Sequence, residues 1–227
     1  MFNIENIRKQ SLTYYIELRM TASGNENRAL DERTVHRDPI KQFAEWYASA
    51  VSSNEPFADA MTLATATTGG KPSARIVLLK GVDPLGFVFY TNYSSRKGEE
   101  LATNPFGALV FFWREQNRQV RIEGSLRPVT PEESDEYFAS RPRESQIGAV
   151  SSPQSKVIPD RETLARTFEE NGRRFLDKPV QRPPHWGGYR LSPTRIEFWQ
   201  GRDARLHDRI EYVLQKDSSW LIRRLAP

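Results

Sequence analysis

The segment from Glu197 to Arg209 gathers the residue types best suited to chemistry in this chain. An aromatic run, Glu197-Phe198-Trp199-Gln200-Gly201, is followed closely by Arg205-Leu206-His207-Asp208-Arg209. A Trp ring offers a stacking face, a guanidinium offers a fixed fork of donors, and an imidazole exchanges a proton near neutral pH. So many charges side by side are poorly suited to a hydrophobic core. The segment therefore indicates a site for a flat, anionic, aromatic ligand, although a structural role is the commoner one for a lone His.

Two cations, Arg75 and Lys80, interrupt the apolar run Ser73–Lys80. Burying an unpaired cation is costly, so each should meet an anion unless it lies at a strand end in solvent or pairs with a carboxylate. Strict alternation along a strand would place the two side chains on opposite faces. Both side chains can then contact a ligand only if the strand has a bulge, if one of them lies at a strand end, or if they bind two separate ligands.

Two further basic segments lie at predicted helix ends. Arg96-Lys97 follow Ser95 at a predicted helix start, where free backbone N–H groups favour phosphate. Tyr137 and Arg141 are spaced to lie on one helical face, and Ser145 adds a hydroxyl. Each segment also has an ordinary explanation, namely a solvated helix cap in the first case and a helix C-terminus rich in Arg in the second.

Composition and missing motifs exclude several classes of site. The chain has no Cys, which excludes disulfides, thiolate nucleophiles and Cys-based zinc sites. Its His residues, at positions 36, 185 and 207, lack metal-ligand spacing, so we predict no metal site. The P-loop, dinucleotide-binding and serine-hydrolase signatures are also missing. The 33 basic and 29 acidic residues are interspersed, which favours local pockets for anionic small molecules over nucleic-acid binding.

Nothing in the sequence resembles a targeting segment. Residues 1–20 carry several charges and no apolar core, and no apolar run reaches the length needed to span a membrane. We therefore expect a cytoplasmic protein with no membrane partner.

The apolar periodicity predicts a mainly β fold with peripheral helices. Residues 1–37 are polar and weakly periodic, which predicts a flexible N-terminal arm, and residues 38–227 form one domain. Helices are predicted after Asp38, Ser95, Thr130 and Asp160, and strands at 61–67, 73–80, 87–91, 106–113, 119–126, 188–191, 195–199, 210–214 and 220–225. Short strands joined by hairpin-length turns, without regular strand–helix alternation, favour an antiparallel β-barrel of the α+β class.

Taken together, the segments resemble the pyridoxamine (pyridoxine) 5'-phosphate oxidase family, flavoenzymes that make pyridoxal 5'-phosphate. The resemblance extends from about Asp38 to the end of the chain, while residues 1–37 match poorly. It is carried by Arg75–Lys80, Tyr90-Thr91-Asn92, Ser95-Arg96-Lys97, Arg118-Gln119-Val120, Tyr137-Phe138, Ser140-Arg141-Pro142, Ser145–Ala149, Gln154-Ser155, Trp186-Gly187-Gly188, Glu197–Gly201, Arg205–Arg209 and Arg224–Pro227.

The resemblance implies a split β-barrel homodimer that holds flavin mononucleotide (FMN) between its subunits. It implies oxidation of pyridoxamine and pyridoxine 5'-phosphate with O2 as electron acceptor and H2O2 as product. It places FMN contacts on Arg75, Ile76, Val77, Leu78, Tyr90, Thr91, Arg96, Lys97, Gln119, Gln154, Ser155, Trp199 and Arg209. It places the substrate phosphate on Lys80, Tyr137, Arg141 and Ser145, and the pyridine ring on Arg205, Leu206 and His207, with Arg205 and His207 as the catalytic pair. Arg75 and Lys80 would then serve two different phosphates.

Two alternatives remain at this point. A non-catalytic carrier of flavin or pyridoxal phosphate could use the same barrel, because related barrels host several functions. The sequence pI of about 9.4 also suggests a nucleic-acid binder, although the aromatic residues follow core periods. The intact cluster Arg205-Leu206-His207, together with a full set of phosphate-binding residues, favours an enzyme.

Overall fold

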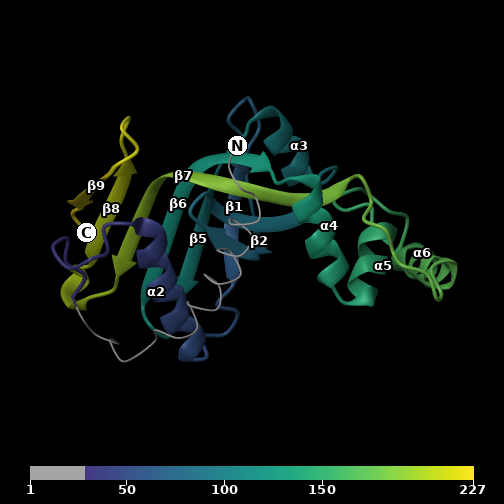
Figure 1. Ribbon diagram of the computed structural model, residues 1–227, viewed down its shortest axis with the longest axis horizontal. Coiled ribbons are helices and arrows are strands. Elements are labelled where there is room, and N and C mark those ends of the chain that lie inside the picture. Colours follow the sequence, from purple (N-terminus) through teal and green to yellow (C-terminus); the bar gives the residue numbers. More distant parts are fainter. Residues whose placement is uncertain (1–28) are drawn as a thin grey trace.

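A curled antiparallel β-sheet dominates the fold, which confirms the predicted mainly β class with peripheral helices (Figure 1). The computed structural model describes residues 29–227. The sheet order is β2-β1-β5-β6-β7-β4-β3, with β8 paired to β7 and β9 paired to β8. The helices α4, α5 and α6 gather at one end of the molecule, and β8 and β9 lie at the other (Figure 1).

The elements have the following bounds. The strands are β1 Ala60–Ala66, β2 Pro72–Leu78, β3 Gly81–Asp83, β4 Gly86–Asn92, β5 Phe106–Trp113, β6 Arg118–Pro128, β7 Trp186–Gln200, β8 Asp208–Leu214 and β9 Trp220–Arg224. The helices are α2 Pro39–Ser52, α3 Arg96–Thr103, α4 Pro131–Ser140, α5 Arg143–Ser151 and α6 Arg161–Arg174, and a short 3-10 turn, η1, covers Asp203–Arg205.

The core lies between one face of the sheet and α2. Asp38 begins this helix as predicted, because its Oδ1 accepts a hydrogen bond from the Ile40 N–H at 2.8 Å and Pro39 occupies the first turn. Phe43 is fully buried and meets the Phe87 ring edge-on, with 4.9 Å between ring centroids. Trp46 meets Phe198 in the same way at 5.2 Å. The apolar stripe of α2 thereby closes one side of the barrel.

Three elements differ from the sequence prediction. The strands expected at 188–191 and 195–199 are one long strand, β7, whose register against β6 shifts at Glu123/Gly124. A Cβ on Gly124 would lie 2.1 Å from the Ser192 carbonyl oxygen, so only glycine fits this irregularity. The short strand β3 and the helix α5 were not predicted. The N-cap residue of α5, Pro142, makes no side-chain capping bond, so the usual start signal is missing.

The described end of the predicted N-terminal arm is packed on the C-terminal strands. Leu30 is buried, its N–H donates to Asp208 Oδ2 at 3.3 Å, and the Tyr212 hydroxyl donates to the His36 carbonyl at 2.8 Å. Residues 1–28 of that arm lie outside the described residues. Within residues 29–227, no helix is long and apolar enough to cross a membrane.

Candidate functional site

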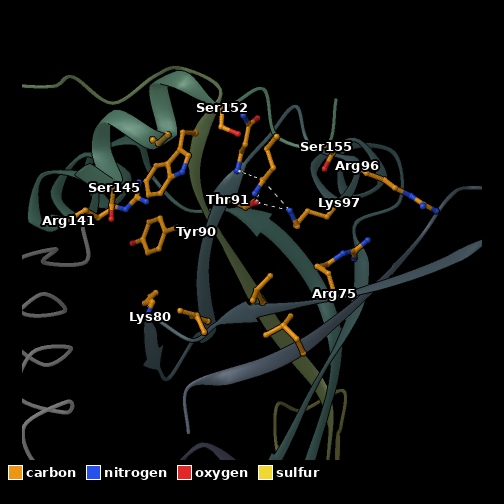
Figure 2. A pocket seen from close by; sticks show the side chains of 18 of the residues that line it. Arg75, Lys80, Tyr90, Thr91, Arg96, Lys97, Arg141, Ser145, Ser152 and Ser155 are labelled. Carbon is orange, nitrogen blue, oxygen red and sulfur yellow. Dashed lines mark hydrogen bonds between the residues drawn. The ribbon is translucent and has the colours of Figure 1, made fainter. Parts of the chain in front are cut away.

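A cavity of about 840 Å³ opens where β2 and β4 meet the start of α3 and the α4–α5 pair (Figure 2). This volume lies in the range of sites for small molecules and cofactors. Its lining includes most of the predicted site residues, namely Arg75, Ile76, Val77, Leu78, Lys80, Tyr90, Thr91, Arg96, Lys97, Tyr137, Arg141, Ser145, Gln154 and Ser155. Cations lie on two separate sides of this cavity, as Figure 2 shows.

The first cationic side is built by the edge of β2 and the start of α3. Lys97 is buried, and its Nζ donates to Thr91 Oγ1 at 3.1 Å, to Ser95 Oγ at 3.3 Å and to Gln154 Oε1 at 3.2 Å. All three partners are neutral, and burial together with the charge of Arg75 lowers the pKa of Lys97. A buried ammonium held only by neutral acceptors would gain strongly from an anion in the cavity.

Glu100 links the two arginines on this side, although the sequence reasoning did not single it out. Its Oε2 accepts from the hydroxyls of Thr65 and Ser73, and both hydroxyls accept from the guanidinium of Arg75. Its Oε1 accepts from Arg96 Nε at 3.0 Å. Arg75, Arg96 and Lys97 with this one carboxylate leave a surplus of two positive charges, which matches a phosphomonoester dianion. The one available signal was the i,i+4 spacing of Arg96 and Glu100.

Replacing Glu100 with Gln is expected to destabilise the protein by about 1–3 kcal/mol near neutral pH, since a buried hydrogen-bonded charge is lost. Burial raises the pKa of Glu100, but the hydrogen bonds and the charge of Arg75 outweigh it and lower the pKa to about 2. The stabilisation is therefore present above the unfolded pKa and is lost as the pH falls toward 2. Urea unfolding at fixed protein concentration should show that the difference in unfolding free energy between wild type and Glu100→Gln narrows as the pH falls from about 5 to about 3. Glu99→Gln on the same helix is the matched control, and a gap that stays constant with pH would contradict this account.

The second cationic side is aromatic and is built by β4, α4 and α5. A capping box begins α4, with Thr130 Oγ1 accepting from the Glu133 N–H and Glu133 Oε2 accepting from the Thr130 N–H. This helix carries Tyr137, whose ring stacks on that of Tyr90 with 3.9 Å between centroids. Arg141 follows at its C-terminus, 4.6 Å from the centroid of Trp186. The predicted helix and its capping box are confirmed here.

Arg141 is the strongest anion-binding candidate on this side. Its Nη1 is buried and has no hydrogen-bond partner within the described part of the chain, which is unusual because buried polar groups are nearly always paired. Ser145 also lines this side. Lys80 follows the end of β2 and pairs with Asp59, with 2.9 Å between Nζ and Oδ2. Because Lys80 lies beyond the strand, alternation does not separate it from Arg75, and both reach the same cavity.

The remaining predicted residues form a second cluster outside this cavity. Gln119, Trp199 and Arg209 lie side by side across β6, β7 and β8, and Arg205, Leu206 and His207 follow in and after η1. The Trp199 and His207 rings are 4.7 Å apart, and Arg209 Nε donates to Glu197 Oε1 at 2.8 Å. The strand β8 lies at the opposite end of the molecule from α4 and α5 (Figure 1). One chain therefore does not bring the two halves of the predicted site together.

An exposed apolar surface lies between the cavity and this second cluster. Ile76, Phe106 and Phe112 are each about 60% exposed, and Phe112 pairs with Gln119 across β5 and β6. This sheet face connects the cavity with the second cluster. Its exposed aromatic side chains indicate contact with another protein surface.

Comparison with known proteins gives a consistent family assignment. Residues 49–172 match the family model described as pyridoxamine 5'-phosphate oxidase, and residues 186–227 match the pyridoxine 5'-phosphate oxidase C-terminal dimerisation region. A pyridoxine/pyridoxamine 5'-phosphate oxidase of Polaromonas sp. is 52% identical over 212 residues, covering 93% of this chain and 98% of that protein.

Two solved structures share the fold. PhzG from Burkholderia lata, in complex with tetrahydrophenazine-1-carboxylic acid, has a TM-score of 0.83 and 30% identity, covering 92% of this chain and 100% of that one. A pyridoxamine 5'-phosphate oxidase-related, FMN-binding protein from Nostoc punctiforme has a TM-score of 0.66 at 16% identity, covering 79% and 95% of the two chains.

Proposed function

Because the chain belongs to the pyridoxamine 5'-phosphate oxidase family of flavoproteins, we propose that it oxidises pyridoxine and pyridoxamine 5'-phosphate to pyridoxal 5'-phosphate. O2 would be the electron acceptor and H2O2 the product. The observation that carries the proposal is a single cavity with two separate cationic sides, one for the phosphate of FMN and one for the phosphate of the substrate.

The residues on the first side suit FMN. The buried Lys97, whose hydrogen-bond partners within the described residues are neutral, and the arginines bridged by Glu100 present the field and the donors that a phosphomonoester needs. Ile76, Val77 and Leu78 on β2, with Tyr90, Thr91, Gln154 and Ser155, would hold the rest of the cofactor. Bound FMN would supply the redox chemistry, taking two electrons from the substrate and passing them to O2.

The second side suits the substrate phosphate. An anion at Arg141 would satisfy its buried Nη1, and Lys80, Tyr137 and Ser145 would add further donors. The stacked rings of Tyr90, Tyr137 and Trp186 shield this side from water, which strengthens the electrostatic contacts made there.

A homodimer would complete the site. The C-terminal dimerisation region, residues 186–227, contains η1, β8 and every residue of the second cluster except Gln119. We propose that Gln119, Trp199 and Arg209 of one subunit meet FMN held mainly by the other, and that Arg205, Leu206 and His207 meet the substrate ring. Arg205 would orient the substrate and steady charge at the carbon that is oxidised, and His207 would help to orient that contact.

The test is the visible spectrum of the purified protein before and after anaerobic addition of pyridoxine 5'-phosphate. We expect a flavin spectrum that bleaches and then returns with air. A flavin spectrum that ignores the substrate would contradict the proposed reaction and favour the carrier. A protein without flavin, even after incubation with FMN, would refute the cofactor assignment.

PhzG was solved in complex with tetrahydrophenazine-1-carboxylic acid, so a reduced phenazine carboxylic acid is a second candidate substrate. The higher identity to the relative from Polaromonas sp. and the two cationic sides favour the phosphorylated substrate. Bleaching by tetrahydrophenazine-1-carboxylic acid, without bleaching by pyridoxine 5'-phosphate, would reverse this preference. The flexible arm at residues 1–37, the single domain at 38–227 and the cytoplasmic location stay predictions.

A further inference from the structure

We propose that Asp208 is a positioning residue that locks the loop formed by residues 202–207, and that β9 and the segment 30–32 hold this lock in place. The inference rests on the proposed function only in that this loop carries Arg205 and His207. Asp208 itself has no role in the site as described so far.

The carboxylate of Asp208 joins three segments that are distant in sequence. Its Oδ2 accepts from Arg202 Nε at 2.8 Å and from the Leu30 N–H at 3.3 Å, and its Oδ1 accepts from Arg224 Nη1 at 2.9 Å. The side chain is 17% exposed, so these contacts are partly protected from water. Both carboxylate oxygens are therefore engaged in fixed contacts around the loop.

Arg224 extends the lock to the N-terminal segment. Its Nη2 donates to the Leu30 carbonyl at 2.9 Å and to Glu32 Oε2 at 2.8 Å, while its Nη1 remains on Asp208. One guanidinium on β9 thus holds both the segment 30–32 and the acid that closes the loop. Asp208, Arg224, Glu32 and the backbone of Leu30 form one network, and the loss of one of these groups is expected to weaken the remaining contacts.

The loop needs such a lock because its backbone is strained. Ala204 and Arg205 have φ values of 53° and 62°, a region that residues other than glycine rarely adopt. A residue in this region keeps its conformation only when the surrounding structure holds it there. Ala204 and Arg205 lie between Arg202 and Asp208, whose ion pair closes the loop. Without that pair the backbone can relax and move the guanidinium of Arg205.

The same loop fixes the ring of His207. The Arg202 N–H donates to His207 Nδ1 at 3.0 Å, so the neutral ring carries its proton on Nε2. The ring also lies against Trp199. The position of Arg202 therefore sets both the closure of the loop and the tautomer of the imidazole.

The test compares Asp208→Asn with wild type in kinetics, flavin binding and amide hydrogen exchange. We expect kcat for pyridoxine 5'-phosphate to fall about 10-fold, with FMN affinity within about 2-fold of wild type and faster exchange of residues 203–207. Asp217→Asn, in the turn that follows β8, is the matched control, because within residues 29–227 the hydrogen bonds of its carboxylate go to Ser219. Unchanged exchange and unchanged kcat would overturn the inference.

A double-mutant cycle keeps the inference testable if Asp208→Asn folds poorly. Arg224→Gln and Glu32→Gln act on the same lock from outside the loop and leave Asp208 in place. Each should lower kcat and speed the exchange of residues 203–207, and their cycle should be strongly non-additive in kcat. Additive effects would mean that the two residues act separately and would also overturn it. A wild-type protein that does not turn over pyridoxine 5'-phosphate would refute the proposed function instead, while the exchange measurement would still test the lock.

Discussion

An Arg205→Ala variant is expected to keep its flavin and to lose turnover of pyridoxine 5'-phosphate by about 100-fold or more, the usual cost of removing one donor that stabilises a transition state. Within residues 29–227, the exposed side chain of Arg205 makes no ion pair and no hydrogen bond, and its backbone is held at φ 62°. A strained residue that presents an unpaired guanidinium is poorly explained by stability and well explained by a ligand. Steady-state kinetics and the flavin spectrum of the same sample measure both parts of the prediction.

The way in which turnover is lost identifies the role of Arg205. A fall in kcat with little change in KM would show a contact made mainly in the transition state, whereas a rise in KM alone would show simple binding. Arg173→Ala provides the control, since that exposed residue of α6 forms its ion pair, among the described residues, with Glu169 one turn away. Turnover close to wild type for both variants would remove Arg205 from the catalytic pair.

Local sequence patterns predicted the parts of the site that are local in sequence. Residues 75–78, 90–97 and 137–145 each form one strand, one strand–helix junction or one helix end, so neighbouring side chains reach the cavity together. Glu100 was missed because a Glu on a short helix is usually a solvated residue, and only the fold shows that Arg75 lies next to it. The helix α5 was missed because no capping residue marks its start.

Contacts between distant segments could not be predicted in this way. Leu30 lies in a polar stretch that reads as a mobile arm, yet its N–H and carbonyl are held by Asp208 and Arg224, which are 178 and 194 residues away. Periodicity reports which face of an element is apolar, not which remote element covers it. The same limit applies to the second cluster, because only the folded chain shows that its residues do not line the cavity.

Two inactive variants are expected to restore activity to each other if the site is shared between subunits. Arg141→Gln removes the half-buried cation of the substrate side, and Arg205→Ala removes the guanidinium of the loop, so each homodimer should be inactive. In a heterodimer, one site combines the intact cavity of the Arg205→Ala chain with the intact loop of the Arg141→Gln chain. The other site carries both lesions. A heterodimer purified through two different tags should therefore show about half of the wild-type turnover, because one of its two symmetry-related sites is intact.

The recovery separates the shared site from a site within one chain. If cavity and loop of the same chain met, every site in the heterodimer would carry one lesion and no activity would return. Pairing Arg141→Gln with an Arg141→Gln/Arg205→Ala double variant controls for subunit exchange, since no intact combination then exists. The exposed Ile76 and Phe112 lie on the surface that such pairing would cover. Recovery in the first heterodimer but not in the control would explain why the cluster does not line the cavity of its own chain, since each would complete a site in the partner.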